Sequence, residues 1–267
     1  MTPRAPDQDH GNEQTGGRAW PAPRVAEHAS VARGTCIVVP AYDAAKTIEG
    51  VLGDLARVLP EVTGRVVVDD GSHDDTGQLA ARAGAHVVSH GRNRGKGAAL
   101  VTGLATARSL GYETALAVDA DGQHPAESAR DVLYAEGDPR TLVLGIRDLV
   151  LEGAPRANRM SNGISNYFLS LFAGRRLRDT QCGLRRYPIR ETLALAASAS
   201  GYAFEAEILL RAADAGMRIT ERDVRVIYPP EHERVTHFDS VRDPARIIVV
   251  VLSTVRDLRV RARSMRA

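Results

Sequence analysis

The chain has 267 residues, which is enough for one large α/β domain, or two small ones, with a buried core. Its hydrophobic fraction of 43% and charged fraction of 25% are ordinary for a globular protein, and a formal net charge of +2 gives no reason to expect nucleic acid as a partner. The two cysteines, Cys36 and Cys182, have neither the number nor the spacing of a disulfide scaffold or a zinc site, which favours a reducing compartment such as the cytoplasm.

The N-terminal segment differs in composition from the rest of the chain. Residues 1–33 are rich in proline, glycine and charged side chains without hydrophobic periodicity, so we expect a disordered tail. From Thr35 onward, short aliphatic runs alternate with segments of helical spacing. We expect strands at 35–39, 65–68, 86–88 and 114–118, and helices at 44–59, 74–83 and 97–110. This alternation predicts an α/β fold with a mainly parallel sheet flanked by helices.

The second half of the chain has a less regular pattern. We expect a strand at 142–145, helices at 158–173 and 204–215, and a strand or ribbon at 218–228. The globular domain is predicted to cover residues 34–241, and residues 242–267 are predicted to form a C-terminal helix with a basic tail.

The closing helix, expected at 244–260, joins an apolar segment to a cluster of arginines. Its aliphatic run, Ile247 to Leu252, is too short to span a membrane, which takes about 20 residues. Such a segment suits the surface of an anionic membrane, which predicts peripheral contact at the inner face of the cell membrane. An ordinary packing helix with a basic end also explains the pattern.

Polar residues gather where three predicted strands end, in segments 40–43, 69–72 and 119–123. Ligands of a doubly wound sheet bind beyond the carboxyl ends of its strands. The adjacent carboxylates of Asp69 and Asp70 are costly at the end of a buried strand unless they meet a cation or hydrogen-bond donors. Ordinary turn chemistry is the alternative, since Asp and Gly are common in turns.

Two further segments have the chemistry of a phosphate site. Asp119 and Asp121 alternate on an extended segment, so both can point at one hard cation that keeps bonds to substrate phosphates; a structural role is the alternative. Segment 91–97, Gly-Arg-Asn-Arg-Gly-Lys-Gly, precedes a helix whose start favours an anion. It lacks P-loop spacing, and a solvated basic turn is the alternative.

Taken together, these motifs resemble the family 2 glycosyltransferases over about residues 35–258. The strings are Val39-Pro40-Ala41-Tyr42, Asp69-Asp70-Gly71-Ser72, Asn93-x-Gly95-Lys96-Gly97 and Asp119-x-Asp121-x-Gln123-His124-Pro125. The second half resembles the dolichyl-phosphate or polyprenyl-phosphate sugar synthases. The residues that carry this second resemblance are Gly145-x-Arg147, Arg159 with Asn162, the segment Asp179 to Arg185, and Phe204-Glu205-x-Glu207.

The resemblance implies a GT-A type nucleotide-diphospho-sugar transferase fold and inverting chemistry on a nucleotide-diphosphate sugar. It implies a Mg²⁺ or Mn²⁺ ion held by Asp119, Asp121 and Gln123. Nucleotide binding is predicted for Pro40, Ala41, Tyr42, Asp43, Asp70, Lys96, Asp119 and Ala120. The family pattern after Pro-x-Tyr is usually Asn-Glu; here it is Asp43-Ala44, which leaves the nucleotide base open.

The resemblance also implies an acceptor site. Acceptor contacts are predicted for Arg147, Arg159, Asn162 and Arg185, and catalytic roles for Arg147, Arg159, Asp179 and Glu205. A hydroxyl acceptor needs a base, for which Asp179 and Glu205 are candidates, whereas a phosphate acceptor is already anionic. Asp179 could instead orient an arginine, and Glu205 could be a helix-start charge.

We therefore expect sugar transfer to a polyprenyl (dolichyl-type) phosphate. The alternatives are transfer to a soluble hydroxyl acceptor, such as a glycan or secondary metabolite, and a non-catalytic nucleotide-sugar-binding protein.

Overall fold

The computed structural model describes residues 30–135, 138–154, 156–198, 203–228 and 242–264. Most of the predicted disordered tail, residues 1–29, lies outside the described residues. Its last four residues were predicted wrongly, because residues 30–33 form a helical turn in which Val31 and Ala32 are buried. A helical turn therefore precedes the first strand.

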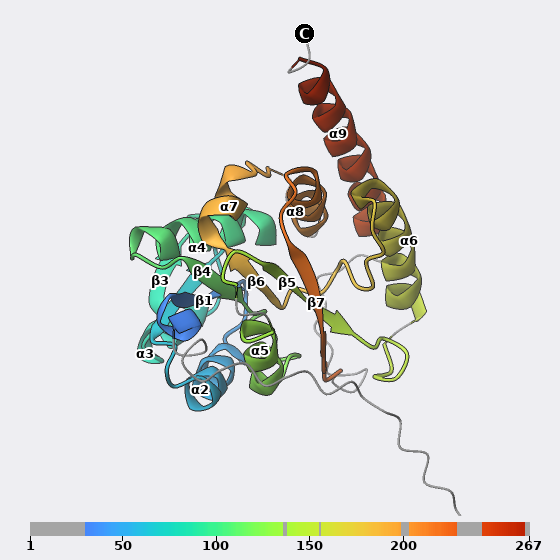
Figure 1. Ribbon diagram of the computed structural model, residues 1–267. Coiled ribbons are helices and arrows are strands. Elements are labelled where there is room, and N and C mark those ends of the chain that lie inside the picture. The colour runs from blue at the N-terminus through green and yellow to red at the C-terminus, as the bar shows by residue number, and fades with distance from the viewer. Residues whose placement is uncertain (1–29, 136–137, 155, 199–202, 229–241, 265–267) are drawn as a thin grey trace, which may run out of the picture.

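A seven-stranded sheet forms the centre of the molecule, in the order β3-β2-β1-β4-β6-β5-β7 (Figure 1). Strands β1 to β4 pair in parallel, β5 pairs in parallel with β7, and β6 runs antiparallel to both β4 and β5. The prediction of a mainly parallel sheet is confirmed. The strands are β1 (Thr35–Ala41), β2 (Gly64–Asp69), β3 (His86–Ser89), β4 (Thr114–Ala117), β5 (Leu142–Arg147), β6 (Arg185–Pro188) and β7 (Ile219–Val224).

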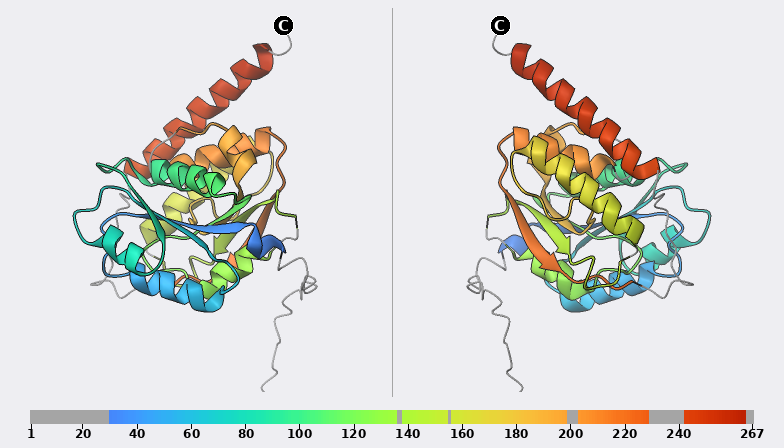
Figure 2. Two further views of the ribbon diagram at one scale, coloured as in Figure 1. Left: turned by 90° about the vertical axis from the view of Figure 1, so that its left-hand side faces the viewer. Right: turned by 90° about the vertical axis from the view of Figure 1, so that its right-hand side faces the viewer.

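Helices cover both faces of this sheet (Figures 1 and 2). One face carries α2 (Ile48–Val58), α3 (Thr76–Arg82) and α5 (Ala126–Leu133). The other carries α4 (Lys96–Ser109), α6 (Arg156–Ala173), α7 (Ile189–Ala194), α8 (Ala203–Asp214) and α9 (Arg242–Ser264).

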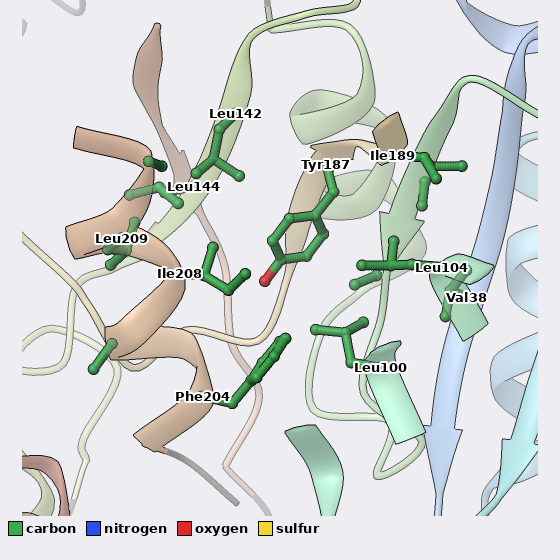
Figure 3. Packing of buried hydrophobic residues seen from close by; sticks show 14 of the residues in the cluster. Val38, Leu100, Leu104, Leu142, Leu144, Tyr187, Ile189, Phe204, Ile208 and Leu209 are labelled. Atoms are coloured by element: carbon green, nitrogen blue, oxygen red, sulfur yellow. The ribbon is translucent and has the colours of Figure 1, made fainter. Parts of the chain in front are cut away.

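Alternate residues of the central strands enter different cores. Val38 and Val68 face the α4 side, whereas Ile37 and Val67 face the α2 side, since successive strand side chains point to opposite faces. Figure 3 shows the first core, where Tyr187 of β6 lies among apolar side chains from the sheet, α4 and α8. Because the central strands are buried on both faces, their sequences are continuous aliphatic runs and do not alternate with polar residues.

The sequence pattern did not reveal three of the described elements: α5, β6 and α7. Strand β6 is the clearest case because Arg185 and Arg186 are both fully buried in it. Arg186 donates from Nη1 to the Leu133 carbonyl at 2.6 Å and from Nη2 to the Asp138 carbonyl at 2.9 Å. Because backbone carbonyls accept these hydrogen bonds, the guanidinium can be buried in the core. Strand β6 is therefore buried without the run of aliphatic residues from which a buried strand is predicted.

Helix α9 packs against α6 and α8 through Val251 and Thr254, and its distal end extends beyond the domain (Figure 2). This supports a packing role for its inner face. Among the described helices, none combines the length and apolarity needed to cross a membrane.

The sheet topology gathers the polar segments at one edge. Parallel pairing brings the carboxyl ends of β1, β2 and β4 together. Because β6 is antiparallel to β4 and β5, the end of β5 and the segment before β6 lie at this same edge. Residues from both halves of the sequence therefore meet there.

Candidate functional site

The loops after β1 and β2 are tied together by hydrogen bonds. The Asp43 N–H donates to Ser72 Oγ at 3.0 Å, and the His73 N–H donates to Asp43 Oδ1 at 2.7 Å. The Tyr42 ring packs edge-on against His73 with centroids 6.0 Å apart. Asp43 has a φ of 48°, a left-handed conformation that Asn and Asp adopt more readily than most residues. The predicted nucleoside segment 40–43 is thus held in a defined shape.

The side chain of Asp70 does not point toward the predicted nucleoside site. It is only 3% exposed, and its carboxylate accepts hydrogen bonds from the backbone N–H groups of Arg94 at 3.0 Å and Gly95 at 2.7 Å. His90 Nδ1 lies 2.6 Å from the same carboxylate. The predicted direct contact with the nucleoside is therefore corrected: Asp70 is turned inward and holds the loop that leads to Lys96.

Lys96 opens α4 and links two carboxylates from distant parts of the sequence. Its Nζ lies 2.7 Å from Asp119 Oδ1 and 3.0 Å from Glu205 Oε1. The Glu205 side chain is only 3% exposed, and Lys96 lies between it and the more open Asp119. Glu205, predicted as a candidate base, is therefore an anchor for the lysine in this structure.

Asp119 and Asp121 lie close enough to influence each other's ionisation. Burial raises the pKa of Asp119, but the charge and hydrogen bond of Lys96, together with the charges of His124 and Arg147, outweigh it and the pKa is lowered overall. The pKa of Asp121 is raised, first by partial removal of its carboxylate from water and then by the negative charge of Asp119. Two carboxylates that repel each other at one point are a fitting arrangement for a cation.

The neighbouring backbone fixes the geometry of this pair. The Ala120 carbonyl accepts a hydrogen bond from Thr47 Oγ1 at 2.6 Å, and Asp121 Oδ1 accepts one from the Gln123 N–H at 2.9 Å. The Gln123 carbonyl accepts from the Ile227 N–H at 2.7 Å. The segment from Ala120 to Gln123 is thus tied to both α2 and the chain after β7.

The donor set fits a hard divalent cation such as Mg²⁺ or Mn²⁺. Asp119 and Asp121 supply carboxylate oxygens, which these ions prefer. Within the described ranges, no group of three or more His, Cys, Asp and Glu side chains is placed to hold a metal. At a site with two carboxylates, a diphosphate and water would complete the coordination of such an ion.

Asp179 holds an arginine at the end of β5. Arg147 Nε donates to Asp179 Oδ2 at 2.7 Å and Arg147 Nη2 donates to Oδ1 at 3.0 Å, while Asn162 Nδ2 donates to Oδ1 at 2.8 Å. Burial raises the pKa of Asp179, but the charge and hydrogen bonds of Arg147 outweigh it and the pKa is lowered. Both carboxylate oxygens are engaged, so the structure favours the orienting role over the role of a base.

Arg185 does not face the site. It is fully buried, and its guanidinium donates to the backbone carbonyls of Cys182 at 2.8 Å, Thr180 at 2.7 Å and Glu205 at 3.2 Å. The predicted acceptor contact is corrected, since Arg185 has no surface to offer an acceptor. It joins the chain before β6 to the start of α8.

A cavity of about 340 Å³ lies beside Arg147. Its charged lining includes Arg147, Arg159 and Arg178 with the acidic Asp148 and Asp223, and its polar lining includes Asn162 and Asn166. Arg178 is paired with Asp223 at 2.8 Å. Asp179, which holds Arg147, and Gly183, which lies against Asp119, both belong to the short segment before β6. The cavity and the carboxylate pair are therefore linked through this segment at one edge of the sheet.

Sequence reasoning missed Gly183 as a site residue. A Cβ at this position would lie 2.5 Å from Lys96 Nζ and 2.7 Å from Asp119 Oδ1. The only sequence signal was a glycine within the segment from Asp179 to Arg185, and nothing in that segment reveals which strand end it meets.

We expect Gly183→Ala to lower the rate of sugar transfer about 100-fold, because displacement of reacting groups by about 1 Å has this effect. The added methyl would push Asp119 away from Lys96. Initial rates measured with the best donor would test this. Gly53→Ala in α2 is the matched control because a Cβ there meets nothing within 4 Å. Equal rates for the two variants would contradict the prediction.

Comparison with known proteins shows the family of this chain. Residues 36–191 match the model of the family described as glycosyl transferase family 2. Glycosyltransferase AglJ of Haloferax volcanii is 31% identical over 215 residues, covering 78% of this chain and 67% of that protein. Undecaprenyl-phosphate mannosyltransferase of Micrococcus luteus is 29% identical over 197 residues, covering 69% of this chain and 79% of that protein.

The fold agrees with solved structures as well. Glucosyl-3-phosphoglycerate synthase from Mycobacterium tuberculosis, solved with Mn²⁺, UDP-glucose and phosphoglyceric acid, superposes with a TM-score of 0.68 at 20% identity, covering 89% of this chain and 86% of that one. The predicted GT-A fold is confirmed. Since the family model spans more than half of the sequence, the chain belongs to glycosyl transferase family 2.

Proposed function

We propose that this chain is an inverting glycosyltransferase that moves a sugar from a nucleotide-diphosphate sugar to a polyprenyl phosphate. The observation that carries the proposal is the arginine-lined cavity, linked by the segment from Asp179 to Gly183 to the carboxylate pair of Asp119 and Asp121. One part suits a metal-bound diphosphate, and the other suits the anionic head of an acceptor.

On the donor side, Asp119 and Asp121 would hold Mg²⁺ or Mn²⁺. The ion, when bound, neutralises the charge that develops on the leaving diphosphate. Lys96 stands beside Asp119 and is positioned by the loop that Asp70 holds, so its ammonium group can take part in the same charge neutralisation. Segment 40–43 supplies the wall for the nucleoside.

On the acceptor side, a phosphate requires no base because it is anionic near neutral pH. This agrees with the engagement of Asp179 by Arg147 and of Glu205 by Lys96. Arg147 and Arg159 can pair with phosphate oxygens through their planar guanidinium groups, and Asn162 fixes Asp179 behind them. The relatives from Micrococcus luteus and from Mycolicibacterium smegmatis, the latter named polyprenol monophosphomannose synthase, also support a polyprenyl phosphate acceptor.

A second candidate is transfer to a hydroxyl of a small soluble acceptor. The specific observation that favours it is the fold neighbour solved with phosphoglyceric acid and UDP-glucose. In that case the arginines of the cavity would bind the phosphate of the acceptor, while a separate group would take the hydroxyl proton.

A transfer assay with Arg159→Ala tests the acceptor. Nucleotide sugars are screened with Mg²⁺ and Mn²⁺, with and without a short-chain polyprenyl phosphate. We expect Arg159→Ala to raise the KM for polyprenyl phosphate about 10- to 100-fold, because it removes a charge-assisted hydrogen bond to phosphate. The KM for the donor should change little.

Arg108→Ala, at the far end of α4, is the matched control for loss of an arginine. Transfer to a neutral hydroxyl together with no transfer to any polyprenyl phosphate would overturn the lipid acceptor and favour the second candidate.

A further inference from the structure

Helix α6 exposes a continuous apolar stripe. The exposed fraction is 67% for Met160, 39% for Ile164, 67% for Tyr167 and 62% for Leu171. Their spacing of four, three and four residues places all of them on one side of the helix. We call these four residues the α6 stripe. Large apolar side chains gathered on one exposed face mark a surface that binds a protein, a membrane or another apolar partner.

The α6 stripe lies next to the acceptor cavity. Arg159, Asn162 and Asn166 line the cavity from the neighbouring side of α6, whereas Ser165 and Leu169 are buried against the domain. One turn of this helix therefore presents a cavity wall and an apolar surface side by side. Helix α6 lies at the outer side of the domain, alongside α9 (Figure 1).

The loop before α6 extends the apolar surface. Val150 and Leu151 are 72% and 84% exposed, and Val150 also lines the cavity. Apolar side chains therefore surround the cavity on the loop side as well as along α6. A molecule with a charged head in this cavity would find apolar surface directly at the entrance.

The charge on helix α6 itself has one sign, whereas the acidic Asp148 and Asp223 lie in the neighbouring cavity, where Asp223 pairs with Arg178. Helix α6 contains no acidic residue, and exposed arginines stand at its ends: Arg156 at the start, and Arg175 and Arg176 just after the last turn. A partner that complements this face is apolar in its interior and anionic at its surface. An anionic lipid bilayer has this chemistry.

A second copy of the chain fits the same face poorly. In a two-fold pair the same surface patch is used on both subunits. Antiparallel packing of two α6 stripes would bring Arg156 of one copy toward Arg175 and Arg176 of the other. Parallel packing would bring identical arginines together. Both arrangements place like charges next to each other, which opposes association.

We propose that the α6 stripe is a docking surface for an anionic lipid bilayer, and this rests on the proposed transfer to a polyprenyl phosphate. With the α6 stripe in the headgroup region, the cavity opens at the level of the lipid phosphates. A polyprenyl phosphate then reaches Arg147 and Arg159 while its hydrocarbon chain stays in the membrane.

Helix α9 offers a weaker surface of the same kind. Its outward face carries Val249, Leu252 and Val260, but Arg256 and Asp257 lie among them with side chains 81% and 50% exposed. The α6 stripe has no charge within it, which makes it the principal contact and α9 an accessory one.

Vesicle co-sedimentation of the full chain tests the surface without any enzyme assay. The vesicles contain phosphatidylcholine alone or phosphatidylcholine mixed with phosphatidylglycerol. We expect wild type to bind the mixed vesicles and Leu171→Glu to bind about tenfold more weakly, as loss of one buried leucine predicts. Leu110→Glu is the matched control, since Leu110 is a 49% exposed leucine at the end of α4. Leu171→Phe should retain binding.

Three results would overturn the docking surface. These are absence of binding by wild type, equal binding by Leu171→Glu and Leu110→Glu, or a change from dimer to monomer in Leu171→Glu with unchanged vesicle binding. Thermal unfolding of each variant checks that the fold is intact.

Transfer to a short, water-soluble polyprenyl phosphate separates this proposal from the proposed function. If wild type transfers to that analogue but binds no vesicle, the docking surface is wrong and the function stands. If Leu171→Glu alone loses vesicle binding and wild type uses no polyprenyl phosphate, the surface stands and the acceptor is wrong.

Discussion

Replacing Asp121 with alanine is expected to reduce sugar transfer about 1,000-fold while the protein stays folded, because loss of one charge-stabilising group costs about this much. Asp121 is largely a surface residue whose carboxylate repels that of Asp119. Removing it relieves repulsion in the folded protein, so stability should not fall. It also removes half of the carboxylate pair proposed to hold Mg²⁺ or Mn²⁺.

Manganese binding measured by electron paramagnetic resonance in the presence of UDP gives a second readout, which we expect to weaken in parallel with activity. Asp54→Ala is the matched control, because Asp54 is an exposed carboxylate on α2 with a side chain 63% exposed. Near-normal transfer by Asp121→Ala, still dependent on a divalent ion, would show that the ion binds elsewhere.

Replacing Asp179 with asparagine is expected to destabilise the protein by about 3 kcal/mol, because breaking a buried ion pair leaves one charge without its partner. Asp179 has a fully buried side chain, and the side chain of Arg147 is 16% exposed. The small exposure of Arg147 places the cost at the low end for such pairs. Urea unfolding of both proteins measures the difference in free energy. Glu221→Gln breaks the more exposed pair with Arg178 and should cost less than about 1 kcal/mol.

The pH dependence of this effect has a defined sign. The pKa of Asp179 is lowered in the folded protein, so its contribution to stability is complete above the unfolded pKa of about 4. It is lost as the pH falls from there through the lowered folded pKa. The difference in stability between wild type and Asp179→Asn should therefore shrink on the acid side, and a constant difference down to pH values of about 2 would contradict this assignment.

The same variant separates a positioning residue from a base. If Asp179 positions Arg147, the residual activity of Asp179→Asn keeps the shape of the wild-type pH–rate profile, and the KM for the acceptor rises. A base at Asp179 would instead remove one ionisation from the profile. Glu205→Gln gives a parallel test at the other candidate base.

The first half of the fold was predictable because its signals are local. Aliphatic runs such as Val66 to Val68 are buried on both faces, and α2 between the first two strands keeps apolar spacing, so these elements follow from the sequence pattern. Carboxylates also marked the ends of β1, β2 and β4, since Asp43, Asp69 and Asp119 lie within two residues of those ends. The register then follows from parallel pairing, which brings these ends to one edge.

The second half was harder for physical reasons. Strand β6 consists of Arg-Arg-Tyr-Pro, and its burial depends on carbonyls contributed by residues as distant as Leu133. No local pattern contains that information. Helix α5 has only eight residues, which is a short window for a periodic signal.

The candidate site was likewise predictable from the sequence only in part. By itself the sequence determined the fold class, the acidic strand ends and the resemblance to the family, since each depends on residue types at short spacing. Only the tertiary structure decided that Asp70 faces inward to the loop before Lys96, that Asp179 orients Arg147 and that Arg185 is buried. The direction of a polar side chain depends on which donors, acceptors and charges the folded chain brings within about 3 Å. For Asp70 and Asp179 these partners include groups more than 20 residues away in the sequence, and for Arg185 they include the Glu205 carbonyl, 20 residues away.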